Sequence, residues 1–517
     1  MGIEISGYEL ILPLYDKKGA VIQGKELLVN GLYGALDVVD EKTARALREG
    51  RAREIDQREK DRLLLRGHLS ADPGREEEDL KILARVDRQL NRSFASIVLL
   101  PTYDCNFRCP YCFEKHRLKK GENWLHRTMT REMADAVFKA CKGRMDRGVR
   151  ITDLTLFGGE PLLKENMDLI RYISQKAKEL SLDIRAVTNG YELDAYIDLL
   201  KEYSYTNLQI TLDGDREVND RRRIHKDGSG SYDRIIENVQ LAVDNGLPVE
   251  LRINVGPENI NTAVSLKRVF EDKGLTDSEY FTYYFKATTG EYYPGTDREV
   301  GDCEIFEMLL QNGFSFDEAV EHESGYTMIG TGLRELLKKE HYLQASASHC
   351  GAESGMLVVD PAGVVYSCMN FVAKEDLAVG MVDIEEGAFR FGFSRAGWLV
   401  RTVQNIPECS KCPCLFACGG GCAARAFEKE GDYRKEFCGE AKEIFCSIVS
   451  HLAGESYMEG GDEELTKSLK EPLDDLSKSA RETVLTSKSQ KEIYETVKHF
   501  YLKKEDRKNA VQGKRDH

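Results

Sequence analysis

Residues 96–112 read SIVLLPTYDCNFRCPYC, an apolar run that is followed closely by three cysteines. The run Ser96–Leu100 has the length and composition of a buried β-strand. The loop after it carries Cys105, Cys109 and Cys112 within eight residues. Three thiolates at this spacing can hold three irons of a 4Fe–4S cluster and leave the fourth iron open, as a reactive cluster requires. A structural zinc knot that uses His116 as a further ligand is the alternative.

Apolar strands continue along the chain and alternate with segments of helical periodicity. The expected strands are Leu154–Phe157, Ile184–Thr188, Leu208–Leu212, Val249–Val255 and Tyr280–Phe285. The expected helices are Glu132–Lys142, Leu169–Leu180, Tyr232–Asp244 and Thr262–Phe270. This alternation predicts an α/β fold with a parallel sheet, curved as a partial (β/α)6 TIM-like barrel. The chemistry is therefore expected at the C-terminal ends of the strands.

Polar and glycine-rich motifs stand at those strand ends. They are Gly158-Gly159-Glu160-Pro161, Thr188-Asn189-Gly190, Leu212-Asp213-Gly214, and Arg252 with Asn254 on one face of the fifth strand. Each also has a simpler interpretation. The glycine motifs read as turns, Arg221–Arg223 as a solvated basic patch, and Arg252 as a structural ion-pair partner.

The cysteine spacing CxxxCxxC, with Tyr111 before the last cysteine, resembles the motif of the radical S-adenosylmethionine (radical SAM) superfamily. The GGEP segment resembles the one with which that family holds the methionine amino group. The resemblance implies that Cys105, Cys109 and Cys112 hold a 4Fe–4S cluster and carry the catalysis. It implies cofactor contacts from the following residues: Tyr111, Gly158, Gly159, Glu160, Pro161, Asn189, Asp213 and Arg252. It further implies reductive cleavage of S-adenosylmethionine to a 5′-deoxyadenosyl radical, which abstracts a substrate hydrogen.

Nine of the 14 cysteines lie between Cys350 and Cys446. Their order resembles the SPASM domain, an extension of certain radical SAM enzymes that holds two auxiliary 4Fe–4S clusters. A two-site zinc ribbon is the alternative. Carried over by resemblance, the ligands of the first auxiliary cluster are Cys350, Cys368 and Cys422. Those of the second are Cys409, Cys412, Cys418 and Cys438. The resemblance therefore implies three 4Fe–4S clusters and S-adenosylmethionine as cofactors.

The first auxiliary cluster lacks one expected ligand, because Gln344 stands where some family members have a cysteine. An open iron that a substrate thiolate could occupy follows from this absence. Four cysteines remain unassigned: Cys141, Cys303, Cys414 and Cys446. Cys141 is expected to be a buried thiol on a helix, and Cys414 or Cys446 could substitute for an assigned ligand.

The composition divides the chain into five regions. They are a small α+β unit at 1–90, the barrel at 94–300, a helical connector at 301–345, the SPASM region at 346–450 and a charged helical tail at 451–517. The first unit, with strands at Tyr8–Tyr15 and Lys25–Val29 and helices at Glu41–Arg48 and near Glu59–Leu65, is compatible with a winged-helix element that binds a leader peptide by strand addition. A plain N-terminal extension is the alternative.

SPASM enzymes mostly modify peptides, so the resemblance implies a peptide maturase of the kind that acts on ribosomally made precursors. The open auxiliary iron favours a thioether crosslink from a cysteine sulfur to a carbon. A sulfatase-maturing enzyme that forms formylglycine is the main competitor, but Met369 stands where that type has an aspartate. Carbon–carbon crosslinking and oxidative decarboxylation stay open. So does a non-catalytic iron–sulfur or zinc scaffold that binds a peptide.

The formal charge of −15 argues against nucleic acid as a partner. Neither a signal peptide at Met1–Leu14 nor a membrane span is expected, so the interpretation is a cytoplasmic protein. The expected partners are a cysteine-containing precursor peptide with a leader and a reductant such as flavodoxin or ferredoxin.

Overall fold

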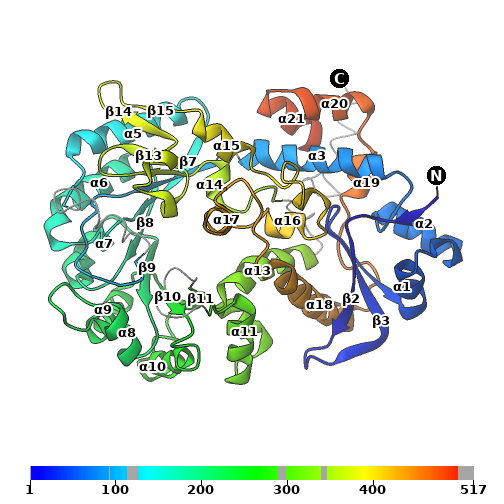
Figure 1. The fold of residues 1–517 in the computed structure, drawn as a ribbon, viewed down its shortest axis with the longest axis horizontal. Coiled ribbons are helices and arrows are strands. Elements are labelled where there is room, and N and C mark those ends of the chain that lie inside the picture. Colours follow the sequence, from blue (N-terminus) through cyan, green and yellow to red (C-terminus); the bar gives the residue numbers. More distant parts are fainter. Residues whose placement is uncertain (1, 92–93, 113–125, 289–297, 339–345, 499–517) are drawn as a thin grey trace, which may run out of the picture. The chain divides into compact units, whose positions relative to one another are not determined.

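The computed structural model describes residues 2–91, 94–112, 126–288, 298–338 and 346–498 (Figure 1). The chain divides into two compact units, each made of separate stretches. The barrel unit comprises Arg92–Gly325 and Gly351–Leu399. The composite unit comprises Met1–Asn91, Tyr326–Cys350 and Val400–His517.

The barrel unit is built on six parallel strands in chain order, which confirms the predicted α/β fold. The strands are β6 Phe94–Leu99, β7 Arg150–Leu156, β8 Asp183–Thr188, β9 Asn207–Leu212, β10 Val249–Val255 and β11 Phe281–Ala287. The helices that follow them are α5 Arg131–Met145, α6 Met167–Glu179, α7 Ile197–Glu202, α8 Arg216–Arg222, α9 Tyr232–Asp244 and α10 Leu266–Asp272. The strands and helices expected from the periodicity of this region are all present. Caps help to set the helix starts, as where Asp215 accepts from the Val218 amide at 3.0 Å to begin α8.

Four short strands extend this sheet beyond β6. They are β12 Leu357–Val359, β13 Val364–Tyr366, β14 Gly380–Asp383 and β15 Ala388–Phe391, and the sheet order is β11-β10-β9-β8-β7-β6-β12-β13-β14-β15. β12 and β13 form a hairpin that turns at Pro361-Ala362-Gly363, and they pair antiparallel across it. The side chain of Asp360 accepts from the Ala362 and Val364 amides at 2.9 Å each, which fixes the turn. The short helices α14 Gly351–Ser354 and α15 Ser394–Val400 flank these strands.

The described residues between 302 and 337 are mostly helical. They form α11 Asp302–Gln311, α12 Phe316–His322 and α13 Ser324–Leu337. α12 begins with a complete capping box between Ser315 and Glu318.

The composite unit begins with a three-stranded antiparallel sheet of order β2-β3-β4. Its strands are β2 Glu9–Tyr15, β3 Val21–Asn30 and β4 Ala35–Asp40, and a small pair joins β1 Glu4–Ile5 to β5 Leu69–Ser70. Helices α1 Glu41–Arg48, α2 Gln57–Arg66 and α3 Pro73–Asn91 follow. α3 is difficult to predict from the sequence because its first residues are mostly charged and show no apolar periodicity. β4 is hidden for another reason: five of its six residues are buried, so it lacks the alternation of a half-buried strand.

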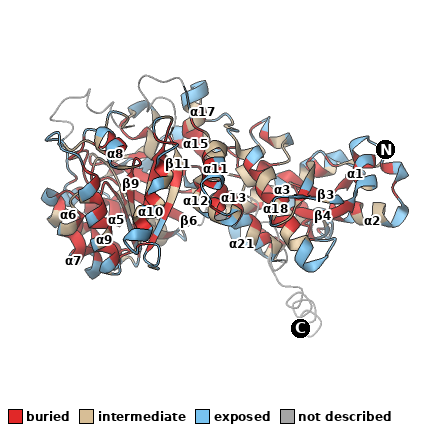
Figure 2. Ribbon diagram, turned by 90° about the horizontal axis from the view of Figure 1, so that it is seen from below, coloured by how far each residue is buried: buried red, intermediate tan, exposed pale blue. Residues whose placement is uncertain are grey.

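The C-terminal part of the chain belongs to the same unit. It contains α16 Leu415–Cys418, α17 Ala423–Glu430, α18 Ala441–Gly460, α19 Lys470–Asp474, α20 Lys478–Thr486 and α21 Gln490–Val497. The helices α19 to α21 pack on the N-terminal region. Leu469, Leu473 and Val484 lie in one apolar core with Leu80 and Leu83 of α3. Figure 2 shows α3 and α18 buried along much of their length.

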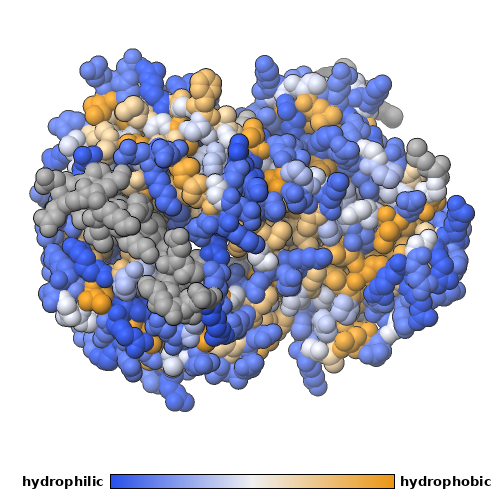
Figure 3. Space-filling view, viewed as in Figure 1, coloured by the Kyte–Doolittle hydropathy of each residue, from blue (hydrophilic) through white to orange (hydrophobic). Residues whose placement is uncertain are grey.

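The surface in Figure 3 is mostly hydrophilic, with apolar side chains gathered in patches, one of them over β2 and β3. Within the described ranges, no helix has both the length and the apolar character needed to cross a membrane.

Candidate functional site

The predicted motifs of the barrel meet at one edge of its sheet. Because β6 to β10 run parallel, their C-terminal ends share one edge of the sheet. The loops after β6 to β9 each carry one of the motifs, and Arg252 and Asn254 lie within β10 itself. The side chains that the sequence singles out in this unit therefore face a common region. The details of their contacts decide what each one does.

The three cysteines of the first motif lie in a partly buried loop after β6. The Phe107 amide donates to Cys105 Sγ at 3.3 Å, and the Cys112 amide donates to the Cys109 carbonyl at 3.2 Å. Burial raises the pKa of Cys105 and of Cys109, and the neighbouring thiols raise that of Cys105 further. These thiols keep their protons in water-poor surroundings unless a metal replaces them.

Backbone pairing holds this loop to the segment after α8. The Arg108 amide donates to the Ile224 carbonyl at 2.8 Å, and the Lys226 amide donates to the Asn106 carbonyl at 2.7 Å. The ring of Phe107 packs edge-on against Tyr191 and His225, which stack on each other with centroids 4.6 Å apart. The loop is thus fixed by the chain itself.

Tyr111, between two of the cysteines, is locked by its hydroxyl. The hydroxyl donates to Asp213 Oδ1 at 2.8 Å and accepts from Arg223 Nη1 at 3.0 Å. The guanidinium of Arg222 lies 4.6 Å from the centre of the Tyr111 ring. The tyrosine therefore ties the cysteine loop to the end of β9.

Asp213 is fully buried and is the centre of a charged network. Arg222 Nε lies 2.9 Å from its Oδ2, and Asn254 Nδ2 donates to its Oδ1 at 3.1 Å. Arg252 joins through Asn254, whose Oδ1 accepts from Arg252 Nε at 2.9 Å. The interpretation of Arg221–Arg223 as a solvated patch is wrong for Arg222 and Arg223, which are buried, and holds only for Arg221.

This network carries an excess of positive charge. Burial opposes the charge of Arg223, but Tyr111, Cys109 and Asp213 hold the pKa of its guanidinium above the ordinary value. The carboxylate of Asp213 lies close to both buried arginines, that of Glu160 also interacts with Arg223, and Arg252 adds a third positive charge. A buried cationic excess is suited to an anionic ligand.

The two glycines of the GGEP segment are required by a close approach of backbones. A Cβ on Gly159 would stand 2.1 Å from the Asp104 carbonyl oxygen, and one on Gly158 would stand 2.7 Å from that of Thr102. Gly158 also has a φ of 130°, in the region that favours glycine. These residues therefore pack directly on the chain that leads into Cys105.

Glu160 joins the ends of two strands. Its Oε1 accepts from Thr188 Oγ1 at 2.6 Å and from the Leu162 amide at 2.9 Å, and its Oε2 accepts from the Asn189 amide at 2.6 Å. Burial raises the pKa of Glu160 to about 7, against the lowering effect of these bonds. Both carboxylate oxygens are thus engaged by the protein, and Pro161 beside it is buried.

The hydrogen-bond donors at the cysteine loop fit a bound iron–sulfur cluster with an organic ligand. Asn189 Nδ2 donates to Asn106 Oδ1 at 2.6 Å. The other end of that side chain, Asn106 Nδ2, is buried and has no hydrogen-bond partner among the described residues. A buried amide donor next to three thiols and a cationic network is the environment that an iron–sulfur cluster with a polar ligand would satisfy.

A second group of thiols gathers in the composite unit. Burial raises the pKa of Cys409, Cys418 and Cys438, and neighbouring thiols of this group, Cys412 among them, raise it further. Cys414 contacts both Cys412 and Cys446 by sulfur hydrogen bonds. Over the described residues, no three His, Cys, Asp or Glu side chains are arranged around a single metal-ion position.

Gly419, Gly420 and Gly421 all adopt left-handed φ angles, of 65°, 89° and 71°. A Cβ on Gly421 would stand 1.7 Å from the Phe437 carbonyl oxygen, directly before Cys438. This tight turn is what brings Cys418 and Cys438 together.

The other cysteines are placed individually. Cys368 follows β13 in the barrel unit, whereas Cys350 and Cys422 belong to the composite unit. Cys141 is a buried thiol on α5, as expected. His116 and Gln344 lie outside the described residues.

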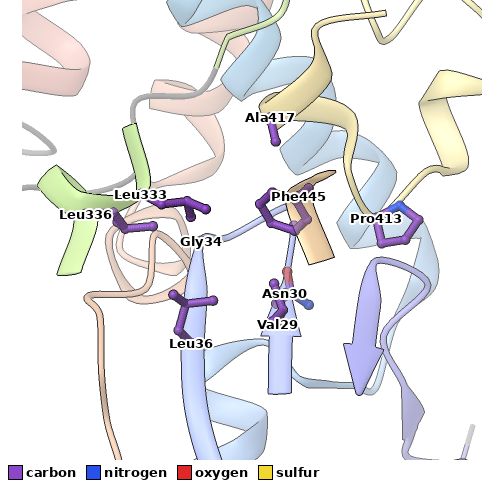
Figure 4. A pocket seen from close by; sticks show the side chains of 10 residues that line it. Val29, Asn30, Gly34, Leu36, Leu333, Leu336, Pro413, Ala417 and Phe445 are labelled. Atoms are coloured by element: carbon purple, nitrogen blue, oxygen red, sulfur yellow. The ribbon is translucent and has the colours of Figure 1, made fainter. Parts of the chain in front are cut away.

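The N-terminal sheet supports the second group of thiols. Tyr8 donates through its hydroxyl to the Ser410 carbonyl at 2.8 Å, and a Cβ on Gly31 would stand 1.6 Å from the Pro413 carbonyl oxygen. Figure 4 shows the small apolar gap beside this contact, of about 30 Å³, with Leu333 and Leu336 on one side and Pro413 on the other. The segment Cys409–Cys418 thus rests on the turn between β3 and β4.

Sequence relatives agree with this geometry. The family model for the radical SAM superfamily matches residues 99–269. Mycofactocin maturase from Mycobacterium tuberculosis is 23% identical over 339 residues, which cover 63% of this chain and 77% of that protein. The serine-type anaerobic sulfatase-maturating enzyme from Bacteroides thetaiotaomicron is 23% identical over 360 residues, covering 63% of this chain and 82% of that protein.

A solved structure shares the fold. The structure described as native anSMEcpe with bound AdoMet and Cp18Cys peptide matches with a TM-score of 0.51 and 17% identity. The match covers 69% of this chain and 96% of that one. The chain thus contains a radical SAM domain at residues 99–269, and maturases are among its relatives.

Proposed function

We propose that this enzyme is a peptide maturase that uses S-adenosylmethionine and an iron–sulfur cluster held by Cys105, Cys109 and Cys112. The observation that carries the proposal is the cysteine loop itself. It is fixed on both sides by backbone bonds and by Tyr111, beside a buried donor and a buried cationic network. The maturases among the relatives support peptide as the class of substrate.

When bound, the reduced cluster and S-adenosylmethionine supply a 5′-deoxyadenosyl radical that removes a hydrogen atom from the substrate. The chain's own residues bind and orient. The cationic excess around Asp213 suits the carboxylate of the methionine moiety, and the Asn106 amide offers a donor. Because Glu160 is engaged three times by the protein, we assign it a positioning role for the turn after β7.

Two auxiliary clusters complete the proposal. For the second, the mutual proximity of Cys409, Cys412, Cys418 and Cys438 is the support. For the first, the assignment of Cys350, Cys368 and Cys422 rests on the sequence pattern. With three thiolates, one iron of that cluster stays free to bind a substrate cysteine.

Thioether formation is the modification that we propose. It replaces a C–H and an S–H bond with a C–S bond. One hydrogen atom leaves in 5′-deoxyadenosine, the thiol hydrogen leaves as a proton, and the remaining electron would pass to an oxidised iron–sulfur cluster. The product is therefore lighter than the substrate by two hydrogens and has lost a free thiol. Formylglycine formation, the chemistry of sulfatase maturation, is disfavoured because Met369, not a carboxylate, follows Cys368. The substrate is then a cysteine-containing precursor peptide, and a flavodoxin or ferredoxin supplies the electron.

The test is anaerobic reconstitution followed by an assay for 5′-deoxyadenosine. The reconstituted protein should hold about twelve irons and cleave S-adenosylmethionine when reduced. The triple variant Cys105→Ala, Cys109→Ala, Cys112→Ala should keep about eight irons and lose all cleavage. Cys141→Ala is the matched control, since it removes a buried thiol of the same unit that is not proposed as a ligand.

Two results would overturn parts of the proposal. Cleavage that survives in the triple variant would remove the catalytic assignment. A product peptide that keeps every alkylatable thiol would exclude the thioether and leave carbon–carbon crosslinking or decarboxylation.

A further inference from the structure

The outer edge of the N-terminal sheet is covered by the chain itself. β4 is the last strand of the sheet, and its outer edge is paired by residues from the far end of the sequence. The Val38 amide donates to the Glu463 carbonyl at 2.9 Å, and the Leu465 amide donates to the Leu36 carbonyl at 2.9 Å. Asp37 and Glu464 form an antiparallel bridge. The segment Glu463–Leu469, here called the closing strand, thus adds to β4 as an extended peptide would.

Side chains fasten the closing strand at its other end. Thr466 Oγ1 accepts from the Leu36 amide at 2.8 Å and donates to the Gly34 carbonyl at 2.7 Å. Arg66 Nη2 donates to the Thr466 carbonyl at 2.7 Å, and Ser468 Oγ donates to the Arg66 carbonyl at 2.8 Å. Every one of these bonds is buried, so each would leave an unpaired polar group if the strand left.

Apolar burial anchors the closing strand on the helical side. Leu465 and Leu469 are 1% and 4% exposed. Leu469 continues into α19, and the core that it shares with Tyr33 and Leu473 extends to α20 and α21. The strand is also tethered on both sides, by α18 and by α19, which keeps its local concentration far above that of any free peptide.

The strand at the other side of the sheet, β2, packs against α18. The backbone of α18 at Gly454 approaches β2 so closely that a Cβ there would stand 2.0 Å from the Tyr15 carbonyl oxygen. His451 stacks on the Tyr15 ring with centroids 5.4 Å apart. Pro13 within β2 lacks an amide donor.

We propose that the chain permanently closes its own N-terminal sheet, with residues 463–469 as a built-in fourth strand. The sheet then serves as a scaffold for the segment Cys409–Cys418, and a substrate peptide is bound without strand addition to β4. The statement about the substrate rests on the proposed function, whereas the closure itself does not.

The test cleaves the chain between α18 and the closing strand, and it measures whether the closing strand stays bound to β4. A protease site is inserted between Gly460 and Gly461, which are exposed and where an added Cβ would meet no atom within 4 Å. After cleavage of the folded full-length protein, native mass spectrometry measures retention of the fragment 461–517. An excess of a fluorescent synthetic peptide of residues 461–498 measures exchange.

A built-in strand predicts that the fragment stays bound and that less than about a tenth exchanges in a day. Release of the fragment, or its replacement by the labelled peptide within minutes, would overturn the proposal and make the β4 edge an exchangeable docking site. Leu465→Asp in the cleaved protein should release the fragment, which shows that the assay detects release. Glu471→Ala, at an exposed position of α19, should leave it bound. Because neither readout uses S-adenosylmethionine, loss of the proposed enzymatic function would not alter the result.

Discussion

Single side chains at the barrel edge connect the cysteine loop to charges that lie a hundred residues away in the sequence. Tyr111 is the clearest case, since its hydroxyl joins Asp213 and Arg223. The ring fills space, and the hydroxyl satisfies two buried charged groups. These two roles can be separated by a substitution that keeps the ring.

Tyr111→Phe should fold but hold its cluster poorly. Leaving Asp213 and Arg223 without this hydroxyl costs about 1–3 kcal/mol of unfolding free energy. Thermal unfolding measures that loss, and the rate at which a chelator removes iron measures the hold on the cluster. Tyr172→Phe removes an exposed hydroxyl that donates to Asp135 at 2.5 Å, and it should change neither quantity. Equal chelation rates in both variants would contradict the role given to Tyr111.

The sequence predicts where the polar groups of the barrel site lie, but it does not show how they pair. Asp213 and Glu160 could be located because each lies within four residues of the end of a strand that its apolar pattern reveals. The burial of Arg222 and Arg223 could not, because it depends on Asp213 and on a tyrosine in another loop. In the sequence alone three consecutive arginines look like a solvated surface.

At the scale of elements, the turn between β3 and β4 packs directly against the segment Cys409–Cys418. The contact is made by Gly31 and Pro413, both from turns that neither periodicity nor composition links. β4 and the closing strand share this difficulty. β4 shows no alternation, and DEELTKSL reads as a charged loop until the edge of β4 is present to pair with it.

Gly31→Ala should disturb this contact, because the added Cβ would overlap the Pro413 carbonyl oxygen. The backbone of Cys409–Cys418 would then have to shift, with a cost of about 1–3 kcal/mol. We expect loss of about four irons, while the signal of the cluster held by Cys105, Cys109 and Cys112 persists. Iron analysis measures the loss, and electron paramagnetic resonance shows which cluster remains.

Gly332→Ala on α13, where a Cβ meets nothing within 4 Å, is the control and should keep all iron. Full iron content in Gly31→Ala would show that the turn does not support the ligand segment.

On the scale of the whole molecule, two compact units of different composition predict unfolding that is not two-state. The composite unit contains His68, which is fully buried between Glu9 Oε1 at 2.9 Å and Asp37 Oδ2 at 2.6 Å. Burial alone lowers the pKa of His68, but the two carboxylates raise it to about 9. Arg62 and Arg66 also face Asp37, with their nitrogens 2.7 Å and 2.6 Å from its carboxylate oxygens.

The sign of the pH effect follows from that raised pKa. Protonated His68 stabilises the folded composite unit. This stabilisation is complete below about pH 6.5, the pKa of His68 in the unfolded chain, and it is lost as the pH rises through about 9, its pKa in the folded protein. Burial also raises the pKa of Glu9, whose contribution changes in the same direction. Between pH 6.5 and 9.5 the composite unit should therefore lose on the order of 3 kcal/mol, seen in calorimetry as a falling transition temperature. His68→Gln should remove this dependence, and His126→Gln, at an exposed site of the barrel unit, should keep it. A transition of the composite unit that rises over this range would contradict the assignment.

The closing strand also has a consequence for how the protein is made. The first 91 residues share their core with residues up to Val497, so they leave the ribosome long before their partners exist. The barrel unit, whose main stretch is continuous from Arg92 to Gly325, can fold during synthesis, while the N-terminal sheet waits with a bare edge. Truncation before residue 462, or expression of the N-terminal region alone, should therefore yield aggregation-prone chains.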